Sequence, residues 1–137
     1  MAMATVSEIM RRSIPLLTAN MSITEALDKL LSSELSGLPV VDTQRKIIGF
    51  LSEQDCIPNL VKASYHCDNR VTVNDLMYKE PLTVSPDTDV FELARMMGGA
   101  KPKLYPVVED DKVIGIVTRH QVMQVLNEQL QNCSISY

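Results

Sequence analysis

The sequence repeats itself at an offset of 67 residues, and this duplication limits the fold more than any other feature. Three blocks of the first half return in the same order in the second half. The pairs are 6–10 (VSEIM) with 73–77 (VNDLM), 39–42 (PVVD) with 106–109 (PVVE) and, after a deletion of one residue, 47–52 (IIGFLS) with 113–118 (VIGIVT). We therefore predict two repeats at 6–65 and 73–131, a linker at 66–72 and a C-terminal tail at 132–137.

Each repeat shows the same order of local patterns. A short helix is followed by an extended segment, an amphipathic helix, two strands in a hairpin and a closing helix. The elements expected after the short helix are 16–19, 23–35, 38–41, 47–51 and 53–63 in the first repeat, and 82–84, a helix starting after Asp89, 104–108, 113–117 and 119–131 in the second. Each hairpin has one face that needs cover. The sequence predicts a mixed α/β (α+β) fold of two βαββα-type repeats, packed sheet to sheet with pseudo-two-fold symmetry.

Composition excludes several classes of partner. The net charge of −4 and the scattered basic residues argue against nucleic acid. No apolar run approaches the roughly 20 residues of a membrane span, and the N-terminus lacks the blocks of a secretory signal. The three cysteines show no CxxC spacing, which is typical of reduced thiols in a cytoplasmic protein. We expect a cytoplasmic protein that binds neither nucleic acid nor membrane.

Several motifs together resemble a tandem pair of CBS domains. They are the Val-x-x-hydrophobic-Met openings, the run SGLPVVD at 36–42, and the Gly-hydrophobic-hydrophobic-Ser/Thr stretches at 49–52 and 115–118. The resemblance covers nearly the whole chain and implies a stand-alone CBS domain-containing protein. It implies a disc-like Bateman module with two clefts, which in the family often bind AMP, ADP, ATP, S-adenosylmethionine or NAD, and which usually forms a homodimer. No cofactor is required.

The first cleft is expected where the strand at 47–51 leads into the helix at 53–63. Free amides at a helix start suit a phosphate, and the carboxylate of Asp55 is placed to accept hydrogen bonds from both ribose hydroxyls. The resemblance implies these roles for Asp55 and Ser52, and adds residues from the second repeat. Adenine would lie against the loop 83–88 and Leu104, while Lys103 would meet phosphate. The residues expected in this cleft are Ser52, Asp55, Thr83, Val84, Thr88, Lys103, Leu104 and Tyr105.

Helix capping is an alternative explanation for the same residues. Ser52 followed by Asp55 is also an N-cap with an acidic residue in the first turn, which stabilises a helix without a ligand. The second repeat has Thr118 and Gln121 at this spacing, a capping box. Capping explains both repeats, whereas ribose binding favours only the first.

The second cleft lacks the carboxylate, because Gln121 stands where the first repeat has Asp55. A glutamine brings no negative charge to a sugar diol, so we expect solvated residues here rather than a nucleoside site. The residues that would line this cleft are Met21, Leu35, Ser36, Thr118, Arg119, His120 and Gln121.

No other motif indicates chemistry. The run 66–68 (HCD) contains metal-binding residue types, but adjacent residues rarely converge on one ion, so no metal site is predicted. No His accompanies a Ser or Cys as a nucleophile–base pair would require, so we do not expect an enzyme. Two functions remain. One is a sensor that binds an adenosine-containing ligand and signals to an unknown effector protein by a conformational or dimer change; the other is a ligand-free dimerisation and protein-interaction scaffold.

Overall fold

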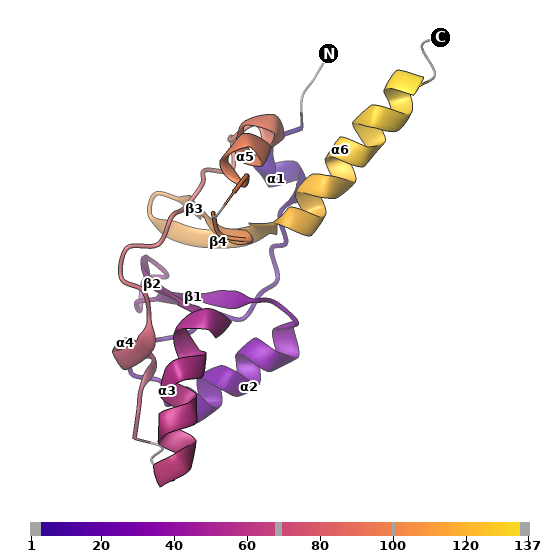
Figure 1. Cartoon of the computed structure of the whole chain (residues 1–137). Helices are drawn as coiled ribbons and strands as arrows, with labels where there is room; N and C mark the ends of the chain where they lie inside the picture. The colour runs from indigo at the N-terminus through magenta and orange to yellow at the C-terminus, as the bar shows by residue number, and fades with distance from the viewer. Residues whose placement is uncertain (1–3, 68–69, 100, 135–137) are drawn as a thin grey trace.

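Two antiparallel hairpins face each other at the centre of the molecule (Figure 1). In a computed structural model of the chain, which describes residues 4–67, 70–99 and 101–134, β1 (Gly37–Val41) pairs with β2 (Ile47–Ser52), and β3 (Leu104–Glu109) pairs with β4 (Lys112–Thr118). The second hairpin turns at Asp110 and Asp111, whose φ angles of 52° and 65° are those of a tight two-residue turn. Each hairpin gains a third segment by parallel pairing, Leu17 with Val40 and Val84 with Val107.

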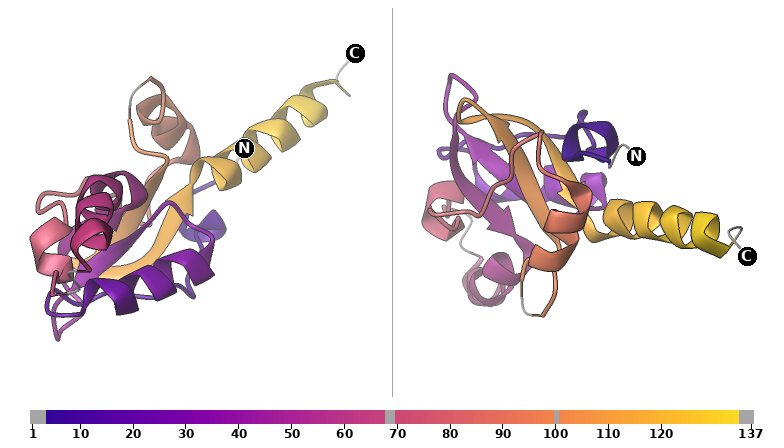
Figure 2. Two further views of the ribbon diagram at one scale, coloured as in Figure 1. Left: turned by 60° about the horizontal axis from the view of Figure 1, so that its bottom comes forward. Right: turned by 90° about the horizontal axis from the view of Figure 1, so that it is seen from above.

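Helices cover the outer faces of the two hairpins (Figure 1). On the first hairpin lie α2 (Ile23–Ser33) and α3 (Glu53–His66), and on the second lie α5 (Val90–Met96) and the first turns of α6 (Arg119–Ser134). The later turns of α6 project away from the hairpins (Figure 2). The short helices α1 (Val6–Ile9) and α4 (Val73–Leu76) open the two repeats. The predicted fold, with two repeats of one kind and hairpins packed together, is confirmed.

The two repeats exchange their opening segments. Val6 and Met10 belong to the apolar cluster of the second repeat, while Val73 belongs to that of the first. The main chain at Arg11 pairs with Ile116 through hydrogen bonds of 2.8 and 3.0 Å. In the same way Phe50 and Tyr78 pair through bonds of 2.9 and 2.8 Å, so each hairpin is extended by a strand segment from the other repeat.

Two glycines allow this close approach. A Cβ on Gly115 would lie 2.7 Å from the carbonyl oxygen of Arg11, and a Cβ on Gly49 would lie 2.6 Å from the sulfur of Met77. At such distances a side chain would force the crossing segments to shift, because a Cβ on Gly49 would also lie 3.0 Å from the Tyr78 carbonyl oxygen. The repeated Gly in the two matched blocks is therefore explained by the crossing of the exchanged segments.

The helix ends differ from the predicted ones. Helix α2 stops at Ser33, two residues early, because Glu34 takes a left-handed φ of 61°. Helix α3 continues to His66, where Cys67 ends it with a φ of 52°. Helix α6 runs through Ser134 and so enters the predicted tail. Tail residues 135–137 and linker residues 68–69 lie outside the described residues. The repeat boundaries stay predictions.

Candidate functional site

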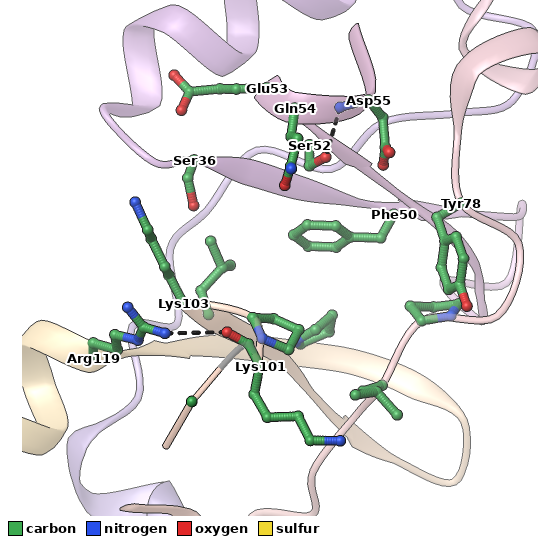
Figure 3. A pocket seen from close by; sticks show the side chains of 16 residues that line it. Ser36, Phe50, Ser52, Glu53, Gln54, Asp55, Tyr78, Lys101, Lys103 and Arg119 are labelled. Carbon is green, nitrogen blue, oxygen red and sulfur yellow. Dashed lines mark hydrogen bonds between the residues drawn. The ribbon is translucent and has the colours of Figure 1, made fainter. Parts of the chain in front are cut away.

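A cavity of about 540 Å³ lies between the two halves, where β2 runs into α3 (Figure 3). Both repeats contribute to its wall. From the first repeat come Ser36, Phe50, Ser52, Glu53, Gln54 and Asp55. From the second come Tyr78, Pro81, Leu82, Gly99, Lys101, Pro102, Lys103, Leu104, Pro106 and Arg119. The volume is in the range of small-molecule sites.

The carboxylate of Asp55 is not used by the helix that carries it. Ser52 caps α3 by accepting a hydrogen bond of 3.0 Å from the main-chain N–H of Asp55. The Asp55 side chain is exposed and forms no hydrogen bond or ion pair within 4–67, 70–99 and 101–134. Figure 3 shows it directed toward the space between Ser52 and Tyr78. Its acceptor positions are therefore available to a ligand.

Gln121, at the equivalent position of the second repeat, has the opposite arrangement. The side-chain oxygen of Gln121 accepts a hydrogen bond from the Thr118 main-chain N–H at 2.9 Å, and the main-chain N–H of Gln121 donates to the Thr118 hydroxyl at 3.4 Å. This reciprocal pair is the predicted capping box. Length does not prevent an aspartate from reaching back, because Asp75 accepts from the Thr72 N–H at 2.9 Å. The equivalent side chains of the two repeats thus differ in role. The Gln121 side chain caps a helix, whereas the Asp55 side chain faces a cavity.

Two aromatic side chains form one wall of the cavity. Phe50 on β2 and Tyr78, paired to it from the second repeat, both line the space. The Phe50 ring packs over Gly37, where a Cβ would collide with it. The sequence interpretation missed both residues. The sequence did contain a signal for Phe50. Aromatic residues are scarce, with only two Phe and four Tyr, and Phe50 replaces the aliphatic Ile116 of the matched block in the second repeat.

Cationic side chains gather on the part of the wall from the second repeat. The Arg119 guanidinium donates to the Lys101 carbonyl at 3.1 Å, and the Arg119 N–H donates to the Lys103 carbonyl at 2.9 Å. In Figure 3 the side chains of Lys103 and Arg119 lie with Ser36 at the end of the cavity away from Tyr78. The first residue of α6 is thereby fixed to the chain that precedes β3.

The structure brings together some predicted residues and separates others. Ser52, Asp55, Lys103 and Leu104 line the cavity as expected for the first cleft. Ser36 and Arg119, expected in the second cleft, line this same cavity. The sequence predicts that the closing helix of the second repeat lines only the second cleft. In the structure Arg119, the first residue of this helix, lines the cavity that corresponds to the first cleft.

Four residues expected in the first cleft do not line this cavity. Side chains alternate along a strand, so Leu104 and Pro106 face the cavity while Tyr105 points into the core of the second repeat. Val84 is buried beside Val107, and the carbonyl of Thr88 accepts from the Val6 N–H at 2.8 Å. Thr83, the fourth, precedes this pairing and is only half-buried.

The remaining residues of the expected second cleft have structural roles or face solvent. Met21 and Leu35 are half-buried against the core of the first repeat. Thr118 and Gln121 form the capping box, and His120 is exposed on the first turn of α6.

Two buried side chains adjoin the site without lining it. The hydroxyl of Tyr105 is buried and has no hydrogen-bond partner among the residues described. Burial raises the pKa of Tyr105, and the positive charge of Arg119 partly offsets this. Burial, followed by the charges of Asp55 and Glu53, raises the pKa of Cys56 from 9.0 to about 11. The Cys56 thiol therefore stays protonated at neutral pH and serves as core filler, not as a nucleophile.

The described ranges contain neither a metal-ligand cluster nor a membrane-spanning helix. There, no three or more His, Cys, Asp or Glu side chains are grouped to hold a metal ion. None of the helices in these ranges has the length and apolar character needed to cross a membrane.

Comparison with known proteins assigns the family. The family model for the CBS domain matches twice, at residues 6–62 and 73–128. An A-adding tRNA nucleotidyltransferase from Aquifex aeolicus is 32% identical over 92% of this chain, but the chain spans only 15% of that enzyme's length. Two further curated relatives are spanned over 42% and 63% of their length.

Solved structures show the same fold. CBSX2 from Arabidopsis thaliana, crystallised in complex with AMP, is 30% identical with a TM-score of 0.77, covering 92% of this chain and 98% of that chain. The CBS domain pair of protein MJ0100, in complex with 5′-methylthioadenosine and S-adenosyl-L-methionine, is 26% identical with a TM-score of 0.77, covering 93% and 99%. With two matched repeats and these neighbours, the chain belongs to the CBS domain family and carries a pair of CBS domains.

Proposed function

We propose that this chain is a regulatory module that binds an adenosine-containing ligand of the AMP, ADP or ATP class in the cavity between its repeats. The observation that carries this function is the free carboxylate of Asp55 at the start of α3, facing a cavity with walls from both halves. The adenosine ligands of the CBS pairs CBSX2 and MJ0100 support the ligand class.

The wall suggests how such a ligand would lie. Asp55 would accept hydrogen bonds from the two ribose hydroxyls, which are charge-assisted and therefore strong. The apolar side of the cavity, formed by Phe50, Tyr78 and Leu104, offers aromatic and aliphatic surface for the adenine. The phosphate would then point toward Lys103 and Arg119 at the opposite end.

A ligand in this position would connect the two halves. It would touch the first turn of α3 and the first residue of α6, the two helices that follow the hairpins. A ligand shifts an equilibrium between two conformations only as far as its affinities for them differ, usually by about 1–3 kcal/mol. If the two conformations differ in the angle between the halves, an effector protein that binds one of them more tightly would respond to the ligand. Catalysis by the chain itself is not part of this function.

Association of two copies is the second element of the function. Helix α3 exposes three apolar side chains, Ile57 at 59%, Val61 at 66% and Tyr65 at 86%, and α6 exposes Met123 and Leu130. Large apolar side chains grouped on helices favour a protein partner. We propose that a homodimer forms through these helices, and this surface also supports the alternative of a ligand-free scaffold. The cysteines are free thiols, which agrees with a cytoplasmic location.

A ligand panel tests this function. Wild-type protein would be titrated calorimetrically with AMP, ADP, ATP, S-adenosylmethionine and NAD, and melted with each at high concentration. A ligand at 100 times its dissociation constant adds about 2.7 kcal/mol of stability and raises Tm. Silence across the panel, together with a dimeric mass by light scattering, would support the scaffold instead.

A further inference from the structure

We infer that the cavity discriminates among adenosine ligands by charge, binding ADP and ATP more tightly than AMP and disfavouring S-adenosylmethionine. This inference rests on the proposed function and specifies its ligand class. It derives from the distribution of charge over the cavity wall, which differs between the two repeats.

The two repeats carry different residues at equivalent positions of the wall. Ser36 and Glu53 in the first repeat correspond to Lys103 and Arg119 in the second, and all four line the cavity. The pseudo-symmetric space therefore has one cationic side, which gives a bound nucleotide a defined direction. Its phosphate chain would extend along the side from the second repeat.

The cations on this side have no counter-ion among the described residues. The side chains of Lys101, Lys103 and Arg119 form no ion pair with any residue of the described ranges. Two acidic side chains, Glu53 and Asp55, line the opposite side, and Asp55 is assigned to the ribose. A ligand that engages Asp55 thus leaves the cations Lys103 and Arg119 at one end of the cavity, with Glu53 as the remaining carboxylate of the wall.

Lys103 and Arg119 lie near one another at one end of the cavity, whereas the Lys101 side chain points away from them (Figure 3). The two hydrogen bonds from Arg119, to the carbonyls of Lys101 and Lys103, fix the first residue of α6 beside the segment before β3. The positive charges of Lys103 and Arg119 therefore lie at the same end of the cavity in the folded protein. These charges attract an anion, while they repel a ligand with a net positive charge such as S-adenosylmethionine.

Each added phosphate brings about one further negative charge to this side at neutral pH. Lys101 and Lys103 are exposed, so the gain per charge is that of a surface ion pair and is screened by salt. We expect affinity to rise by about threefold for each phosphate from AMP to ATP. This gradient should flatten at high ionic strength.

The experiment is a calorimetric titration of wild type with adenosine, AMP, ADP, ATP and S-adenosylmethionine, without Mg²⁺, at about 50 mM and about 300 mM salt. The variants are Lys103→Gln and Arg119→Gln, with Lys62→Gln on the exposed surface of α3 as the matched control. In either variant the ratio of ATP affinity to adenosine affinity should fall by about threefold or more, while Lys62→Gln keeps the wild-type ratio. The Lys103 side chain forms no hydrogen bond or ion pair with the part of the chain that the structure describes, so this variant stays interpretable if Arg119→Gln is unstable.

The outcomes separate this inference from the function beneath it. Equal affinities for AMP, ADP and ATP, or tighter binding of S-adenosylmethionine, would overturn charge selection and leave an adenosine site standing. An unchanged gradient in Lys103→Gln and Arg119→Gln would overturn the assignment of these cations. If no compound of the series binds wild type, both this inference and the proposed function fail.

Discussion

Replacing Asp55 by Ala should weaken ligand binding strongly while leaving the fold nearly as stable. The cap of α3 uses the main-chain N–H of residue 55, which the substitution retains, and the Ser52 hydroxyl that accepts it. The side chain contributes to stability only through its charge near the start of the helix. For an exposed carboxylate in the first turn this is about 0.3–1 kcal/mol.

The loss of binding should be larger. A hydrogen bond to a charged group contributes about 1.5–3 kcal/mol, so removing the acceptor of the ribose hydroxyls should weaken binding by roughly 10- to 150-fold. Calorimetric titration with ATP measures the loss of binding affinity, and urea unfolding followed by circular dichroism measures the change in stability.

Gln121→Ala is the matched control, because it changes the equivalent residue of the other repeat. It removes a side-chain hydrogen bond of 2.9 Å to the Thr118 N–H and should cost about 0.5–1.5 kcal/mol of stability. Its affinity for ATP should equal that of wild type. Equal ATP affinities in Asp55→Ala and wild type, or an equal loss in both variants, would refute the assignment of different roles to these two residues.

Three further predictions concern stability. The pKa of the Cys56 thiol is raised from 9.0 to about 11, so the free energy of unfolding should fall by about 2–3 kcal/mol as pH rises from 9 to 11; urea unfolding over this range should show the loss, and Cys56→Ala should make the slope shallower, with the rest due to Tyr105, whose pKa is also raised. Tyr105→Phe removes a buried hydroxyl without a described partner and should raise the free energy of unfolding by about 1 kcal/mol, whereas a loss would mean that the hydroxyl has a partner. Gly115→Ala places a methyl group against the Arg11 carbonyl and should cost about 1–3 kcal/mol, measured by thermal melting; an unchanged Tm would mean that the crossing segment can move aside.

The sequence predicted those features that repeat or are local in the chain. The duplication revealed two equivalent units, and the strands expected at 104–108 and 113–117 leave between them Asp110 and Asp111, where the second hairpin turns. The spacing of Ser52 and Asp55 suggested both capping and binding. The structure shows the capping by Ser52 and leaves the Asp55 side chain facing the cavity, so binding by Asp55 stays a prediction.

The missed features join residues far apart in the chain. The pairing of Phe50 with Tyr78 and the exchange of α1 and α4 have no local signature, because each segment alone reads only as a short helix and a strand. Arg119 lines the cavity matched to the first cleft for the same reason: its own element is predictable from the sequence, but the element opposite it is not. The alternation along β3 that removes Tyr105 from the cavity was available from the sequence and was not applied.

The exchange of opening segments has a consequence for how the protein comes into being. A chain leaving the ribosome presents residues 6–66 first, yet the core around Leu38 and Leu51 includes Val73, which emerges later. Val6 must wait longer still, since its partners extend to Val122. We expect the nascent chain to gain its stable structure late and in a single step, and cleavage in the linker to leave two fragments that hold each other in place.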